Sequence, residues 1–173
     1  RTLQRTLNKI LANQIRFESG GRISGNTIRP SYYKDVRGGK TYAEAKFRGN
    51  QVTYGKTGEL QTETVGGNIS DLFTLAWQLA ANDAKLPARL SITNGKKIYP
   101  VSGMSKIGSG SYTLNGKTTP VEKYRVQRGG DTVTYSFATA LGNIPAQISY
   151  TDDGKTYDLK LTSVSINGKP VKP

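Results

Sequence analysis

The feature that most constrains the fold is a regular alternation of apolar and polar residues near the C-terminus. Apolar side chains occupy every second position in two segments: Ile144, Ala146, Ile148 and Tyr150, and then Tyr157, Leu159 and Leu161. A period of two places one set of side chains on each face of a β-strand, which suits a half-buried sheet. The intervening Asp152-Asp153-Gly154 supplies the residues of a tight hairpin turn. The pattern therefore predicts two antiparallel strands and a chain built mainly from β-structure.

Turn residues recur at short intervals along the chain and favour hairpin connections. The clearest are Asn94-Gly95, Asn115-Gly116, Gly129-Gly130 and Asn167-Gly168. The pattern predicts strands near residues 2–7, 13–19, 28–35, 40–47, 51–54, 58–64, 87–93, 97–107, 117–127, 131–139, 144–150 and 155–166. A shift of the apolar positions from Leu161 to Val164 and Ile166 indicates a bulge where the sheet bends. We expect an antiparallel meander curled into an open or closed, lipocalin-like barrel.

One segment has helical periodicity. Residues 70–81 read SDLFTLAWQLAA, with Ser70 as the expected N-cap and Asp71 near the positive end of the helix dipole. Only Thr74 and Gln78 interrupt its apolar surface, so we expect the sheet to enclose the helix. Either the helix completes a solid core, or it covers an apolar cavity. The second arrangement would make a ligand site of Leu72, Phe73, Ala76, Trp77, Tyr135 and Phe137.

Missing residue types exclude several classes of site. The 173 residues contain no Cys and no His, which rules out thiol catalysis, disulfides, imidazole bases and ordinary zinc sites. The acidic residues are dispersed, and turn chemistry explains the adjacent Asp152 and Asp153. We therefore expect no enzyme activity, no cofactor and no metal site. The length predicts one domain over residues 1–173, with no membrane-spanning run and no visible signal peptide.

Positive charge is concentrated in the first third of the chain. The 25 Lys and Arg outnumber the 12 Asp and Glu, and residues 1–50 hold 11 basic against 3 acidic residues, a balance of +8. This predicts a cationic face for an anionic partner, formed by Arg16, Arg22, Arg29, Lys34, Arg37, Lys40 and Arg48. The alternative is that these residues are only the solvated outward positions of strands. No nucleic-acid-binding motif accompanies them, so nucleic acid is not expected.

Short motifs of strand and turn residues are spread over residues 13–166. They comprise Ser19-Gly20 with Ile23, Ile28-Arg29-Pro30, Tyr32-Tyr33, Asp71-Leu72, Ile144-Pro145, residues 150–154 (YTDDG) and residues 157–163 (YDLKLTS). Together they resemble the pattern of a bacterial family catalogued as domain of unknown function 3108. The resemblance implies a periplasmic envelope protein of Gram-negative bacteria with a lipocalin-like or open-barrel fold, and it implies no reaction.

Two functions from different classes remain open. In the first, the protein is a non-catalytic carrier that holds a lipid or other apolar small molecule, such as an acyl chain, between helix and sheet. In the second, it has a solid core and binds an anionic envelope component, such as lipopolysaccharide or phospholipid, or a protein partner through its basic face. An apolar cavity beside Phe73 and Trp77 would favour the first function. A filled interior with a contiguous basic patch would favour the second.

Overall fold

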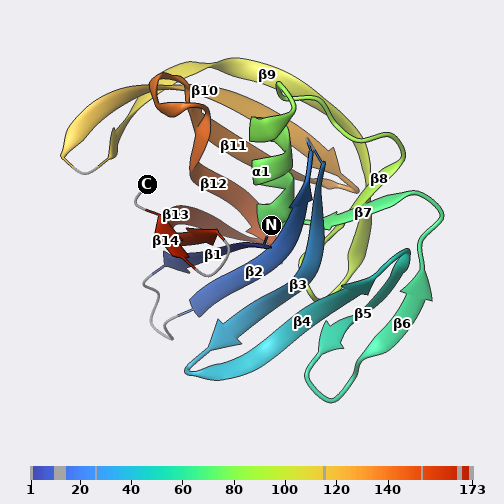
Figure 1. The fold of residues 1–173 in the computed structure, drawn as a ribbon. Helices are drawn as coiled ribbons and strands as arrows, with labels where there is room; N and C mark the ends of the chain where they lie inside the picture. The colour runs from blue at the N-terminus through green and yellow to red at the C-terminus, as the bar shows by residue number, and fades with distance from the viewer. Residues whose placement is uncertain are drawn as a thin grey trace.

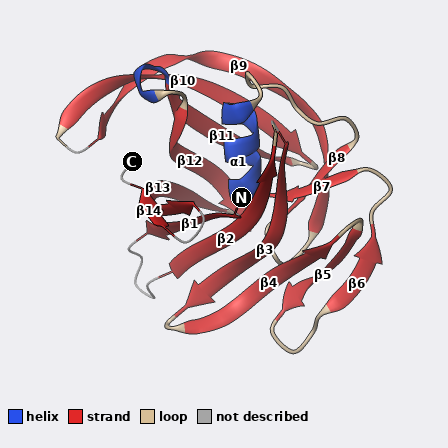
Figure 2. Ribbon diagram, in the orientation of Figure 1, coloured by secondary structure: helices blue, strands red, loops and turns tan. Residues whose placement is uncertain are grey.

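One α-helix lies inside a strongly curled β-sheet in the computed structural model (Figures 1 and 2). The structure describes residues 2–9, 15–25, 27–114, 116–152, 154–166 and 169–171. Its elements are β1 (Thr2–Lys9), β2 (Ile15–Ser24), β3 (Thr27–Arg37), β4 (Lys40–Arg48), β5 (Gln51–Lys56), β6 (Gln61–Thr64), β7 (Asn68–Asp71), α1 (Leu72–Ala81), β8 (Leu90–Thr93), β9 (Ile98–Leu114), β10 (Lys117–Arg128), β11 (Asp131–Ala138), the 3-10 helix η1 (Thr139–Leu141), β12 (Ile144–Asp152), β13 (Lys155–Ile166) and β14 (Lys169–Val171). The predicted mainly β fold with one helix is confirmed.

The strands form two meanders joined into one sheet. Their order is β6-β5-β4-β3-β2-β1-β13-β12-β11-β10-β9-β8-β7, with β14 beside β13. The antiparallel pair of β1 and β13 joins the two arms. Within each arm, strands adjacent in sequence are mostly adjacent in the sheet, because short loops allow no other pairing. The order ends at β6 and β7, which form no ladder with each other among the described residues. The barrel is therefore open along a seam between these two strands.

One strand pair departs from the expected antiparallel meander. The sequence pattern predicts no strand over residues 68–71, yet β7 forms there and runs parallel to β8, with Asn68 opposite Leu90 and Asp71 opposite Thr93. Parallel neighbours need a long crossover connection, and α1 together with residues 82–89 supplies it. The expectation of a wholly antiparallel sheet is therefore wrong at this edge, because the helix is the crossover of a β–α–β unit.

The helix begins one residue later than its expected cap allows. Its N-cap is Asp71 and not Ser70. Asp71 Oδ1 accepts hydrogen bonds from the N–H groups of Phe73 and Thr74 at 2.9 and 2.8 Å, and Oδ2 accepts one from Thr74 Oγ1 at 2.8 Å. Ser70 still pairs with Ile92 of β8, so its backbone is held by the sheet. The parallel ladder thus moves the cap by one residue.

The sheet surrounds α1. Figure 1 shows the helix with β2 and β3 on one side and β11 and β12 on the other, and all four strands contact it. Its buried residues include both members of the expected polar stripe. Thr74 donates to Asp71, and Gln78 Oε1 accepts a hydrogen bond from the Ile28 N–H of β3. Because these polar atoms have partners inside the protein, the helix can be enclosed on nearly every side.

An aromatic cluster fills the space between α1 and the sheet. Phe17 of β2 meets Phe73, Tyr150 and Tyr157 edge-on, with ring centroids 5.7, 6.2 and 6.4 Å apart. Tyr33 of β3 lies 5.5 Å from the Phe73 ring. None of these five side chains is more than 5% exposed. Aromatic pairs at such separations contribute about 0.5–1.5 kcal/mol each beyond the area they bury. The interior beside Phe73 is therefore packed with side chains.

The bulge indicated by the apolar pattern of the last long strand is present. Leu7 of β1 pairs with Leu161, but the neighbouring Thr6 pairs with Ser163, which leaves one extra residue in β13. An extra residue on one strand bends the sheet and increases its twist. The shift in the sequence pattern therefore reports a real change in the register of the first and last long strands.

The expected two-residue hairpins are only partly confirmed. Arg128 pairs with Asp131, so Gly129-Gly130 forms such a turn. Thr93 instead pairs with Ile98, which leaves a four-residue loop over residues 94–97. Its turn is set by Asn94, whose Oδ1 accepts hydrogen bonds from the next N–H groups along the loop. Residues 10–14, Asn115, Asp153 and Asn167-Gly168, which carry other parts of the prediction, lie outside the described residues.

The buried hydroxyl of Tyr54 predicts a loss of stability at high pH. Burial, and then the hydrogen bond and negative charge of Glu63, raise the pKa of Tyr54 to about 12. An unfolded tyrosine ionises near pH 10, so between pH 10 and 12 unfolding releases a proton and stability falls as pH rises, by about 2 kcal/mol at pH 12. Tyr54→Phe removes this contribution, and urea unfolding measured across that range should show a shallower decline than in the unsubstituted protein. An unchanged decline would contradict the assignment.

Candidate functional site

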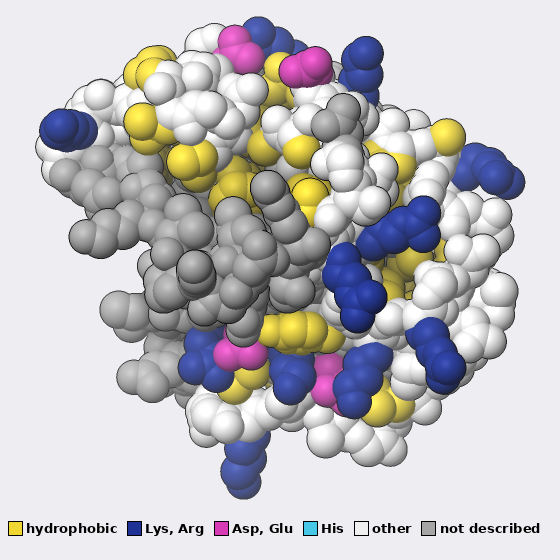
Figure 3. All heavy atoms as spheres, viewed as in Figure 1, with side chains coloured by type: hydrophobic (Ala, Val, Ile, Leu, Met, Phe, Trp, Pro, Cys, Tyr) yellow, Lys and Arg dark blue, Asp and Glu magenta, His cyan; other side chains and the backbone are white. Residues whose placement is uncertain are grey.

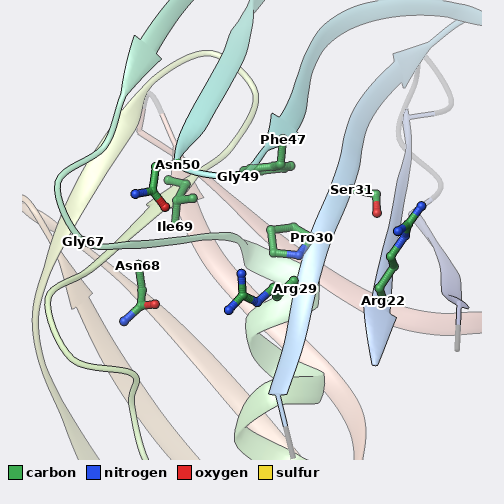
Figure 4. Close-up of a pocket in the computed structure, with 10 residues that line it drawn as sticks. All are labelled: Arg22, Arg29, Pro30, Ser31, Phe47, Gly49, Asn50, Gly67, Asn68 and Ile69. Carbon is green, nitrogen blue, oxygen red and sulfur yellow. The ribbon is translucent and has the colours of Figure 1, made fainter. Parts of the chain in front are cut away.

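A pocket of about 510 Å³ opens next to the seam, between β7 on one side and β3 and the end of β4 on the other (Figure 4). Figure 4 shows the Arg29 side chain extending from β3 toward Asn68 of β7, while Arg22 projects from the neighbouring β2. The volume of the pocket lies in the range of small-molecule sites. We call it the seam pocket, and it is lined by Arg22, Arg29, Pro30, Ser31, Phe47, Gly49, Asn50, Gly67, Asn68 and Ile69.

The β2–β3 hairpin places its two arginines side by side. Arg22 pairs directly with Arg29 in the ladder, and the next pair toward the turn is Ile23 with Ile28. Ile28 is buried, and its N–H donates to Gln78 Oε1 of α1. Because side chains alternate along a strand, anchoring Ile28 on the inner face turns Arg29 to the exposed side. Both arginines are exposed.

Two glycines allow close backbone contacts within the walls of the seam pocket. A Cβ at Gly21 would lie 2.6 Å from the carbonyl oxygen of Arg29, and one at Gly67 would overlap the carbonyl of Arg89. Asn68 is fixed on this wall, because its Nδ2 donates to the Ala88 carbonyl at 2.6 Å. The pocket shape therefore depends on backbone contacts that a larger residue at either glycine would push apart.

The arginines of the seam pocket have no acidic partner. Neither Arg22 nor Arg29 forms an ion pair with any residue that the structure describes. Like charges placed directly opposite each other in a ladder repel. A guanidinium group binds carboxylate or phosphate through paired N–H donors. The hydroxyl of Ser31, the amide of Asn50 and the apolar surface of Phe47 complete a lining that suits an anionic group attached to a small organic body.

The structure separates the predicted cationic face into different environments. Arg16 pairs with Glu18 at 2.8 Å, and Arg37 forms two hydrogen bonds of 3.1 Å with Asp35 while its guanidinium lies 3.8 Å from the Tyr42 ring centroid. The positions opposite Lys34 are both acidic, Glu18 on β2 and Glu44 on β4. Lys40 and Arg48 are exposed at opposite ends of β4. Only two of the seven predicted residues, Arg22 and Arg29, line the seam pocket.

Basic side chains are nonetheless frequent on this side of the molecule. Figure 3 shows Lys and Arg side chains over the lower part of the visible face, where Figure 1 places β2–β5, with Asp and Glu between some of them. The surface around the seam pocket is therefore cationic but interrupted. Within this mixture, Arg22 and Arg29 lie directly opposite each other in the ladder and have no acidic partner among the described residues.

The predicted apolar ligand residues lie in the core. Leu72, Phe73, Ala76, Tyr135 and Phe137 are buried, and Trp77 is half-buried. Tyr135 Oη donates to the Leu72 carbonyl at 2.7 Å, which fixes the start of α1 to β11. Phe137 also lines a small cavity of about 210 Å³ that it shares with the end of α1. The contacts of Phe73 are with other aromatic rings.

Several lining residues had no signal in the sequence. Asn50, Gly67 and Asn68 look like ordinary turn residues, and Gly67 and Asn68 line the same pocket as Arg29 because β7 lies beside β3. That contact depends on the unpredicted β7. The pair of Arg22 and Arg29 could have been found by aligning the two strands about their Gly25 turn.

A scan against family models, a search of curated proteins and a search of solved structures each gave no match. Among the described residues, no helix has the length and apolar character that crossing a membrane requires.

Proposed function

We propose that this protein is a non-catalytic binding protein of the bacterial envelope that takes the phosphate-bearing head group of an anionic lipid in its seam pocket. The observation that carries the proposal is the direct pairing of Arg22 with Arg29 in the absence of an acidic partner among the described residues. A bridging anion would turn a repulsive pair into two charge-assisted contacts. The packed core beside Phe73 supports recognition at this surface over storage of an acyl chain inside.

The envelope location rests on the motifs that resemble domain of unknown function 3108. Lipopolysaccharide and anionic phospholipid both present phosphate groups at membrane surfaces, and the overall charge of +13 favours approach to such a surface. The pocket adds to net charge two exposed arginines on paired strands and an apolar wall at Phe47 and Ile69.

The test is binding to phosphatidylcholine vesicles with and without phosphatidylglycerol, measured by co-sedimentation. We expect binding only to the anionic vesicles, weakening as salt is added. Each arginine near an anionic surface contributes about 1 kcal/mol, so the double change Arg22→Gln with Arg29→Gln should weaken binding about 30-fold. Soluble glycerol phosphate should compete if the pocket recognises the head group itself.

The matched control is a pair of changes that remove the same charge elsewhere. Lys117→Gln with Arg125→Gln alters exposed residues of β10, in the other arm of the sheet. If both double variants weaken binding equally, the proteins respond to net charge and the pocket has no special role. If neither does, lipid recognition through arginine is wrong.

A further inference from the structure

The largest fully buried side chain in the described part of the protein is a charged one. Arg128, the last residue of β10, has no solvent exposure. Its Nη2 donates to the Thr151 carbonyl at 3.1 Å. Its Nε and Nη1 atoms, which carry three of the five N–H donors of a guanidinium, have no hydrogen-bond acceptor among the residues that the structure describes. A guanidinium stays protonated, so the charge persists in the interior.

The surroundings of Arg128 are aromatic. Its guanidinium carbon lies 4.4 Å from the ring centroid of Tyr99 and 5.9 Å from that of Tyr150. Cation–π contacts offset part of the cost of burying a charge, but they satisfy no N–H donor. A buried charge without a partner is strongly unfavourable. The rings hold the guanidinium in place and leave its donors available.

A second buried donor belongs to the same aromatic cluster as Tyr150, because the ring centroids of Tyr33 and Tyr150 lie 6.3 and 6.2 Å from that of Phe17. Tyr33 is fully buried, and its hydroxyl has no hydrogen-bond partner among the described residues. Burial, and then the charges of Tyr150, Asp35 and Asp71, raise the pKa of Tyr33 well above its usual value, whereas Arg128 lowers it. The Tyr33 hydroxyl therefore stays protonated and able to donate.

The nearby carboxylates are committed elsewhere. Asp35 receives two hydrogen bonds from Arg37. Asp71 accepts three hydrogen bonds at the start of α1. Neither forms an ion pair with Arg128, and neither does Asp131, which lies opposite Arg128 in the ladder of β10 and β11. The guanidinium therefore keeps donors that no acidic residue in the described part of the chain accepts.

We propose that Arg128 is the centre of an internal binding site for a small monovalent anion, either an inorganic ion such as chloride or nitrate or a short carboxylate, with the Tyr33 hydroxyl as a further donor. The anion would accept N–H groups that the protein leaves unpaired. The site is separate from the seam pocket and does not depend on the function proposed for that pocket.

The surface near Arg128 favours access by an anion. Tyr99, which packs against the guanidinium, is half-buried and also lines a pocket of about 390 Å³. That pocket contains Lys56, Lys96 and Lys97 and one acidic residue, Glu59. A net positive pocket raises the local concentration of anions. Movement of the Tyr99 ring would connect this pocket with the buried guanidinium.

The experiment measures thermal unfolding in sodium gluconate, whose anion is much larger than the proposed ligands, against sodium chloride, nitrate and acetate at the same ionic strength. For the unsubstituted protein we expect the midpoint temperature to rise with the logarithm of the concentration of at least one small anion, because an anion that binds only the folded state stabilises it. The anion with the largest effect separates an inorganic ligand from a carboxylate. Binding is also measured directly by chloride NMR, in which the protein should broaden the chloride line. Addition of that anion should reverse the broadening.

Arg128→Met should abolish both the anion-specific rise and the line broadening, and Tyr33→Phe should reduce them. Arg125→Met, an exposed change on the same strand, should keep them. Equal midpoints in gluconate and in all three small anions, or an anion response that survives Arg128→Met, would overturn the proposal. If Arg128→Met does not fold, the NMR measurement on the unsubstituted protein and on Tyr33→Phe decides the question.

Discussion

Phe73→Ala should lower the free energy of unfolding by about 3–5 kcal/mol, the cost of removing a large buried aromatic side chain. Phe73 is fully buried at the start of α1 and contacts the rings of Phe17 and Tyr33. The change removes these contacts and leaves a cavity that rigid strands on both sides cannot close. Urea unfolding monitored by circular dichroism measures the loss.

This result also decides between the two arrangements of the helix. If α1 is part of a solid core, Phe73→Leu should recover most of the stability, because it restores apolar volume. If the helix instead covered a ligand cavity, Phe73 would face open space and its truncation would cost about 1 kcal/mol or less, well below the range for packed aromatic residues. Such a small loss of stability would favour the carrier function over binding at the surface.

Asp71→Ala should cost about 1.5–5 kcal/mol. Loss of an N-cap side chain costs about 0.5–2 kcal/mol, and a buried hydroxyl left without its acceptor adds about 1–3 kcal/mol. Asp71 is fully buried and serves both roles, capping the N–H groups of Phe73 and Thr74 and accepting from the Thr74 hydroxyl. The same urea titration provides the measurement.

Two variants separate the cap from other effects of Asp71→Ala. Asp71→Asn keeps an acceptor oxygen for the helix N–H groups and should retain most of the stability. Ser70→Ala tests the cap expected from the sequence, and because the buried Ser70 hydroxyl has no hydrogen-bond partner, its removal should cost nothing. A larger loss for Ser70→Ala than for Asp71→Ala would mean that the cap is wrongly assigned.

The local sequence pattern predicts some features of the helix but not others. The apolar run of residues 72–81 predicts an enclosed helix, and the structure places it inside the sheet. The cap differs by one residue, because β7 pairs with β8 through Asp71. That pairing joins residues about twenty positions apart, and local propensity contains no information about it. The same limitation explains why an antiparallel sheet was expected throughout.

The roles of the basic residues, in contrast, depend mainly on the tertiary structure. Their concentration in the first third of the chain is a property of the sequence, but their roles depend on what lies opposite each one. Arg16 and Arg37 pair with carboxylates of their own strands, whereas Arg22 and Arg29 are ladder partners on neighbouring strands. Nothing in the sequence around Arg128 indicates burial, since a single Arg before a Gly-Gly turn is normally exposed. Its burial follows from packing between Tyr99 and Tyr150.

By itself, the sequence determined most of the strands, the Gly129-Gly130 hairpin, the bulge after Leu161 and the enclosed helix, because each follows from periodicity and turn chemistry over a few residues. The tertiary structure alone decided the parallel β7, the seam pocket, the packed aromatic interior and the buried Arg128. These features depend on contacts between segments far apart in the chain. Whether a side chain is buried or paired is fixed only when the two arms of the sheet curl around the helix, since burial and electrostatic energies depend on the whole surroundings of a group.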